Sequence, residues 1–190
     1  MNEIILLPLL FYDKPLLEYL RSNIAKISGM PLSISNKEFS IKPFYDSERA
    51  QYDAAKIIQY VENQSSSLTV ICTSGDLFIP IFTYVFGLAK LNGHVAIVSS
   101  HRLQNSFYGL QDDRERLEER MLKEVIHELG HLAGLRHCTQ ANCVMTSSSS
   151  ADELDVKDIL YCKVCLKKLM DPVNEKSRFV TRFLEKIITS

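Results

Sequence analysis

The residues best suited to chemistry are two histidines that flank a glutamate, in the run His127-Glu128-Leu129-Gly130-His131. On an α-helix that turns about 100° per residue, side chains four positions apart point about 40° from each other, so both imidazoles can bind one ion. Glu128 lies between them, where it can take a proton from a water that the ion polarises. This arrangement is typical of zinc hydrolases.

A glycine and a third histidine extend this pattern at equal intervals. Gly134 follows His131 by three residues and His137 follows Gly134 by three, which completes the pattern HExxHxxGxxH. After a helix has delivered two ligands the chain must turn sharply, and glycine accepts a positive φ without strain. Three protein ligands leave the fourth position of a tetrahedral zinc ion open, as in catalytic sites. The alternative is a pair of unrelated histidines on a charged helix surface, and the added Gly134 and His137 disfavour it.

Four of the five cysteines form two close pairs in the last third of the chain, Cys138 with Cys143 and Cys162 with Cys165. Four thiolates fill a tetrahedral zinc ion, so the pairs predict a structural zinc site that clamps the loop after the histidine helix to a C-terminal helix. A redox CxxC pair, two disulfides and an iron–sulfur cluster are the alternatives. No thioredoxin-like context surrounds the CxxC. Disulfides are disfavoured because the chain is expected in the cytoplasm, where thiols are kept reduced. Cys72, within an apolar run, is expected in the core.

Composition and charge exclude several classes of protein. With 190 residues, 46% hydrophobic and 24% charged, the chain is predicted to form one ordinary globular domain. Its formal net charge of -1 lacks the basic excess that nucleic-acid binding requires. No apolar run is long enough to span a membrane. The apolar N-terminus carries Glu3 and lacks the positive region of a signal peptide. We therefore expect a cytoplasmic protein that binds neither nucleic acid nor membrane.

Short apolar runs alternate with helical patterns, which favours an α/β fold with a largely parallel sheet. We expect the histidine helix to bury its leucine-rich face and to turn its histidine face outward, as one wall of a cleft. The second helix is expected to begin near Asp46 or Ser47. Residues 86–89 could form an edge strand or the end of a helix. The predicted strands are 4–10, 39–45, 68–72 and 95–99, and the predicted helices are 14–28, 47–62, 112–135, 154–169 and 176–188, with a loop at 147–150.

Taken together, these residues resemble the signature of the archaemetzincins, a family of zinc metallopeptidases of the metzincin clan. The likeness rests on the run from His127 to Cys138, followed by Cys143, Met145, Cys162 and Cys165. It implies a metzincin-like α/β fold, in which a twisted mixed sheet packs on a long active-site helix beside a small zinc-clamped helical part. It also implies one catalytic domain over residues 1–190. In this domain, 1–136 form the sheet and the active-site helix, and 137–190 form the Met-turn, the four-cysteine zinc site and the C-terminal helices.

The resemblance also implies a role for each site residue. His127, His131 and His137 bind a catalytic zinc ion, and Glu128 is the general base and acid. The four paired cysteines bind a second, structural zinc ion. Met145 is the residue of the Met-turn, whose thioether packs beneath the histidines, a role physically close to simple core filling.

The expected activity is zinc-dependent hydrolysis of peptide bonds in a peptide or small protein, with aminopeptidase action suggested by the family. Some metzincins carry a tyrosine two residues after the Met-turn methionine, whereas this chain has Ser147. An edge strand, for which 86–89 is the candidate, is expected to pair with the substrate backbone. The alternative function is a zinc-stabilised docking module with a latent or highly selective metal site. The intact Glu128 favours catalysis, because a pure binding site does not need it.

Overall fold

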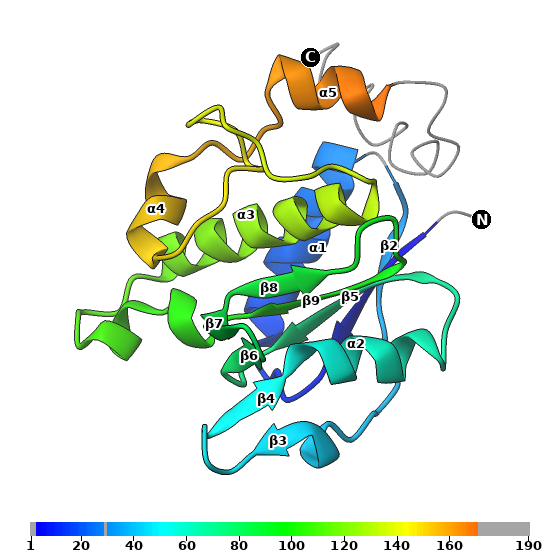
Figure 1. Ribbon diagram of the computed structural model, residues 1–190, viewed down its shortest axis with the longest axis vertical. Helices are drawn as coiled ribbons and strands as arrows, with labels where there is room; N and C mark the ends of the chain where they lie inside the picture. Colours follow the sequence, from blue (N-terminus) through cyan, green and yellow to red (C-terminus); the bar gives the residue numbers. More distant parts are fainter. Residues whose placement is uncertain (1–2, 29, 171–190) are drawn as a thin grey trace.

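Figure 1 shows a computed structural model of the chain, which describes residues 3–28 and 30–170. A five-stranded sheet with strand order β2-β1-β5-β9-β8 lies at its centre. The first four of these strands are parallel, and β8 pairs with β9 in the antiparallel direction at the edge of the sheet. Their bounds are β1 (Ile4–Pro8), β2 (Leu32–Ile34), β5 (Leu68–Thr73), β8 (Gly87–Ala89) and β9 (Val95–Ser99).

Helices cover both faces of this sheet (Figure 1). α1 (Lys14–Ser28) and α3 (Arg114–Leu132) pack on one face, and α2 (Ala54–Glu62) packs on the other. Successive strand residues point to opposite faces, so Val70 and Cys72 join the core beneath α1 and α3, while Ile71 joins the core beneath α2. This layered arrangement confirms the predicted mixed α/β fold and the buried position of Cys72.

Several predicted elements agree closely with the structure. The helix predicted over 14–28 is α1, the strand predicted over 95–99 is β9, and the ambiguous segment 86–89 contains the edge strand β8. The long histidine helix is α3, which begins after Asp113, whose carboxylate accepts a hydrogen bond from the N–H of Arg116. Gly134 follows this helix with φ of +91°, the left-handed turn that the sequence predicts.

The sequence pattern does not predict a second sheet, which has the strand order β3-β4-β6-β7. Its members are short: β3 (Tyr45–Asp46), β4 (Gln51–Asp53), β6 (Leu77–Ile79) and β7 (Phe82–Val85). The strand predicted over 39–45 is wrong, because residues 39–41 form no strand, a 3-10 turn occupies Lys42–Phe44, and only Tyr45 belongs to a strand, β3. This turn includes Pro43, which has no N–H to donate to a neighbouring strand.

The helix predicted over 47–62 begins later than expected. Ala50 takes a left-handed conformation with φ of +55°, and the next residues pair in β4 before the helix starts. The capping residue is therefore Asp53, whose side chain accepts from the N–H of Lys56 at 3.1 Å, rather than Asp46 or Ser47.

The closing helix predicted over 154–169 is two short helices, α4 (Ala151–Val156) and α5 (Lys163–Leu169). The segment between them makes distant contacts that a helix would break. The hydroxyl of Tyr161 donates to the carbonyl of Ile126 at 2.6 Å, and the N–H of Val144 donates to the carbonyl of Leu160 at 3.0 Å. Tertiary bonds thus outweigh local propensity here. The helix predicted over 176–188 lies outside the described residues.

Candidate active site

The last two turns of α3 bring His127, Glu128 and His131 to one side of a cleft. His137 reaches the same point from the loop that follows the turn at Gly134. The three imidazole rings have centroids 4.7, 5.0 and 5.3 Å apart. One ring nitrogen from each histidine lies within 4.8 Å of the others, so the structure brings together all three predicted ligands.

Backbone carbonyls fix the hydrogen position on two of these rings. Nδ1 of His127 lies 2.8 Å from the carbonyl oxygen of Val144, and Nδ1 of His131 lies 2.7 Å from that of Leu135. A carbonyl only accepts, so each Nδ1 carries the hydrogen and each Nε2 presents a lone pair. The two Nε2 atoms are 3.0 Å apart. Lone pairs that face each other at this distance repel unless a cation lies between them, so this set of donors fits a zinc ion.

Burial keeps the three rings in the neutral form. It is the largest cause that lowers the pKa of His127, well below the ordinary value, and the positive charge of Lys157 adds to it. Burial also lowers the pKa of His131 and of His137. Neutral imidazole is the form that binds a metal, so the environment prepares all three side chains as ligands.

The carboxylate of Glu128 lies beside the histidines in an almost closed space. Glu128 is 4% exposed, and its Oε2 has no hydrogen-bond partner among the described residues. Burial raises the pKa of Glu128 well above the ordinary value, and the neighbouring Glu124 raises it further. The backbone of β8 packs against this carboxylate so closely that a Cβ on Gly87 would lie 2.7 Å from Oε1 of Glu128. A buried oxygen without a partner is costly, which indicates a place for a small polar molecule.

Met145 is fully buried against Gly130, the helix residue between Glu128 and His131. A Cβ on Gly130 would collide with the Sδ atom of Met145 and would lie 3.0 Å from the ring of Tyr161. Only a residue without a side chain allows the thioether to approach the helix here. Met145 therefore lies beneath the turn of α3 that carries the histidines.

The expectation for the histidine face of α3 is correct in part: this face lines a cleft, but much of it is buried rather than turned outward. Residues 143–161 cover much of this face, and Arg120, Lys123 and Glu124 beneath them are each at most 5% exposed. Arg120 donates two hydrogen bonds to the carboxylate of Asp155, at 2.7 and 2.6 Å. The positions of apolar residues cannot predict that this face is buried, because the side chains buried there are polar and their partners are distant in the sequence.

The histidines open into a cleft of about 830 Å³. Its lining includes residues of β7 and β8 and residues 147–149. The carbonyl of Phe86 accepts a hydrogen bond from the N–H of Ser99 at 2.8 Å, so Phe86 faces β9. In an antiparallel pair, successive residues direct their main-chain N–H and C=O groups alternately toward the partner strand and away from it. The main-chain groups of Gly87 and Ala89 therefore point away from β9, toward the open edge of the sheet. The hydroxyl of Tyr84 donates to the carbonyl of Ser149, and both residues line the cleft.

Sequence reasoning misses several side chains that line this cleft, among them Tyr84, Glu124 and Arg136. Glu124 has the clearest sequence signal, because it precedes Glu128 by one helical turn and so lies on the same face. The remaining histidines, His94 and His101, do not line the cleft. His94 Nε2 is 2.8 Å from the carbonyl of Ser65, and His101 packs its ring on Phe107.

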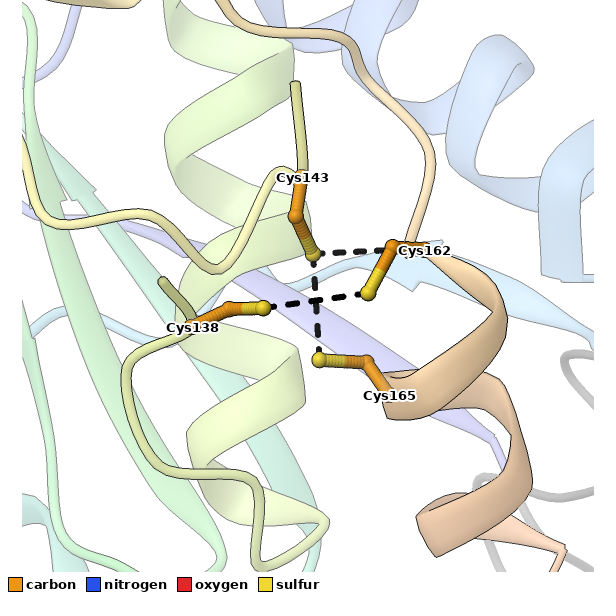
Figure 2. A group of neighbouring side chains, drawn as sticks. All are labelled: Cys138, Cys143, Cys162 and Cys165. Atoms are coloured by element: carbon orange, nitrogen blue, oxygen red, sulfur yellow. Dashed lines mark hydrogen bonds between the residues drawn. The ribbon is translucent and has the colours of Figure 1, made fainter. Parts of the chain in front are cut away.

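The four paired cysteines point toward one another (Figure 2). Cys138 and Cys143 come from the loop after α3, and Cys162 and Cys165 come from the start of α5. The Sγ atoms of Cys138 and Cys162 are 3.7 Å apart, as are those of Cys143 and Cys165. A tetrahedral zinc ion with bonds of about 2.3 Å separates its sulfurs by about 3.8 Å, whereas a disulfide bond is about 2.05 Å long. The cluster therefore fits one tetrahedral ion and not two disulfides.

The chain matches the family model described as peptidase family M54 over residues 27–171. An archaemetzincin of Pyrococcus horikoshii is 42% identical over 139 residues, which cover 68% of this chain and 73% of the relative. An archaemetzincin of Pyrococcus furiosus is 37% identical over 178 residues, with 88% and 92% covered. None of the helices in the described part of the chain is long and apolar enough to cross a bilayer.

Solved structures agree with these sequence relatives. A zinc-dependent peptidase from Methanocorpusculum labreanum superimposes with a TM-score of 0.78 at 33% identity, over 85% of this chain and 97% of the other. An archaemetzincin from Archaeoglobus fulgidus, complexed with malonate, gives a TM-score of 0.77 at 30% identity, over 87% and 99%. The match to the family model and the similarity of the relatives lead to the same conclusion: the chain belongs to the archaemetzincins, peptidase family M54, and is a zinc metallopeptidase of that family.

Proposed function

We propose that peptide bonds are hydrolysed in the cleft, with His127, His131 and His137 as the ligands of a catalytic zinc ion and Glu128 as general base and acid. When bound, the zinc ion supplies the Lewis acidity that polarises the scissile carbonyl and stabilises negative charge in the transition state. One observation carries the proposal: buried Glu128, whose Oε2 has no hydrogen-bond partner among the described residues, lines the same cleft as imidazoles whose lone pairs converge.

Glu128 moves the proton in this proposal. Its carboxylate takes a proton from the attacking water and passes it to the nitrogen of the departing amine. Because burial raises the pKa of Glu128 well above the ordinary value, the carboxyl group holds the transferred proton more readily than an exposed one. The carbonyls of Val144 and Leu135 keep the rings of His127 and His131 in one orientation during the reaction.

The edge strand β8 is the proposed partner of the substrate backbone. The outward main-chain groups of Gly87 and Ala89 can bond to an extended peptide, as in other complexes in which a peptide adds to a sheet edge. The bond between Tyr84 and Ser149 ties β7 to residues 147–149 within the lining of the cleft, and in this proposal it leaves less room for a long chain. This contact supports cleavage near a chain end, and we propose removal of residues from the N-terminus.

A second zinc ion is proposed at Cys138, Cys143, Cys162 and Cys165, where it has a structural role. The sulfur distances of 3.7 Å support it. His137 and Cys138 are consecutive, so this ion also anchors the loop that supplies the third histidine. Thiolate–zinc bonds stabilise short elements that bury little apolar surface, such as α5. Residues 1–190 then act as one catalytic domain.

Mass spectrometry of a diverse peptide mixture, incubated with zinc-loaded protein, tests the proposal. The matched control is Glu128→Gln, which keeps the shape of the side chain and removes its basicity. We expect ladders shortened from the N-terminus, which are absent with the control, and equal zinc contents in the two proteins. Internal cuts would overturn the aminopeptidase part alone. Equal cleavage by the two proteins would overturn the role of Glu128, and no cleavage by either protein would favour a zinc site that binds without turnover.

A further inference from the structure

A buried ion pair lies directly behind the proposed catalytic residues. The ammonium of Lys157 is 3.4 Å from Oε1 of Glu124, and their side chains are only 2% and 7% exposed. Removing two such charges from water costs about as much as their attraction returns, so apolar residues of similar size are often equally stabilising. Stability alone therefore does not account for this pair.

Lys157 makes a second bond, to the chain beneath the histidines. Its ammonium donates to the carbonyl of Thr146 at 3.2 Å. Thr146 follows Met145, and the carbonyl of Val144 on the other side of Met145 is bound to His127. The carbonyls on both sides of the Met-turn methionine are thus held, one by a proposed metal ligand and the other by Lys157.

The segment that carries Lys157 is itself fixed to α3. Arg120 donates two hydrogen bonds to Asp155, and Lys123 donates to the carbonyl of Leu154 at 2.9 Å. Lys157 therefore extends from a firmly anchored backbone. Its extended conformation, with ψ of 152° after the end of α4, lets it reach both Glu124 and the Met-turn.

Glu124 completes the arrangement from within α3. It precedes Glu128 by one turn and lines the same cleft. A lone cation so close to the histidines would oppose the binding of a metal cation, and the carboxylate of Glu124 offsets this charge. The pair can hold the Met-turn without adding net positive charge beside the histidines.

We propose that Lys157, with Glu124 as its counterion, is a positioning residue that holds the Thr146 carbonyl and so fixes the Met-turn under the histidine site. Neither side chain reacts with the substrate in this proposal. Lys157 acts through the Met-turn backbone, which sets the orientation of His127 and of the rim formed by residues 147–149. The inference rests on the proposed function for its effect on turnover, but its effect on metal geometry can be measured without turnover.

The test variant is the double substitution Glu124→Gln with Lys157→Met. Single Lys157→Met leaves a buried carboxylate unpaired and could unfold the chain, whereas the double variant removes both charges at nearly constant volume. Lys157→Arg is the conservative variant, because it keeps a positively charged hydrogen-bond donor at this position. Lys123→Met is the matched control, because Lys123 is an equally buried lysine that donates to a carbonyl of α4 rather than of the Met-turn.

Each protein is prepared with zinc at the cysteine site and cobalt at the histidine site. The readouts are thermal unfolding, the visible absorption of cobalt, and kcat and KM on a cleaved peptide. We expect the double variant to fold, to shift the cobalt bands, and to lose about 10-fold or more in kcat with little change in KM, since small misplacements of catalytic groups have effects of this size. Lys157→Arg should restore most of both signals. Lys123→Met should shift the cobalt bands much less than the double variant, because it removes one anchor of the segment that carries Lys157 but leaves the bond to Thr146 in place.

A folded double variant with the wild-type cobalt spectrum and kcat would overturn the proposal. An equal change of the cobalt spectrum in Lys123→Met would also overturn it, because any buried lysine would then suffice. If wild-type protein cleaves no peptide, the proposed function fails on its own, and a shifted cobalt spectrum in the double variant would still support the positioning role.

Discussion

Replacing Gly87 with alanine is expected to displace the carboxylate of Glu128. The new Cβ would lie 2.7 Å from Oε1, 3.0 Å from Cγ and 3.1 Å from Cδ of Glu128. Ordinary contact begins near 3.4 Å, so the oxygen must retreat by about 0.7 Å, and Glu128, at 4% exposure, has little free space to do so. A misplacement of about 1 Å can cost about 100-fold in rate, so we expect kcat/KM to fall by about 10- to 100-fold. This loss equals about 1.4 to 2.8 kcal/mol of transition-state stabilisation.

The assay is the initial rate of peptide cleavage by Gly87→Ala, read with zinc content and thermal unfolding. The same substitution in a Glu128→Asp background gives a sharper comparison, because the shorter side chain leaves room for the methyl group. Gly87→Ala should then cost much less than it does in wild type. Gly93→Ala is the control, since its Cβ would lie 2.8 Å from the carbonyl of Lys90, and it should reduce stability without a selective loss of kcat. An equal penalty for Gly87→Ala in both backgrounds would refute the steric argument.

Further outcomes are expected at the metal sites and beneath them. His131→Ala should lose one zinc ion per chain with a small change in Tm, whereas Cys162→Ser should lose the other zinc ion with a large fall in Tm. Metal analysis and calorimetry measure both effects. Equal zinc contents in the two variants and in the wild type would contradict the presence of two sites. Gly130→Ala should push Met145 off the helix and destabilise the fold by about 1 to 3 kcal/mol, as denaturant unfolding would show. In metal-free protein, the folded state lowers the pKa of His127 below the ordinary 6.5, so the unfolded chain binds more protons and stability should fall as the pH drops through and below that value. Urea midpoints at about pH 7.5 and about pH 5.5 measure this change in the Glu128→Gln variant, because the raised pKa of Glu128 would act in the opposite direction over the same range. No difference between the two midpoints of that variant would contradict the argument.

The sequence predicts best where a local rule is enough. The HExxH spacing, the turn at Gly134 and the two cysteine pairs each follow from the geometry of one helix or one ion, and the structure brings those residues together. The apolar periodicity of 14–28 likewise predicts α1. The family resemblance added the expectation for Met145, whose burial against Gly130 agrees with it.

The sequence predicts poorly where distant contacts decide the local structure. The break between α4 and α5 depends on Tyr161 bonding to Ile126, 35 residues away. The buried partners Glu124 and Lys157 are separated by 33 residues and look like exposed helix charges in the sequence. The second sheet depends on parallel pairing of β4 with β6 across the whole of α2. The spacing of apolar residues along the sequence carries no information on such long-range pairings.

The short open edge of β8 also bears on how the protein avoids self-association. An exposed strand edge can recruit the edge of another molecule and begin aggregation. β8 has only three residues, Gly87–Ala89, and Lys90 follows at once, so an edge of this length offers a second sheet few main-chain bonds and a nearby charge. The same brevity limits how tightly any extended peptide can be retained by backbone pairing alone. A strand that ends early therefore limits main-chain pairing in the same way for a second sheet and for an extended peptide.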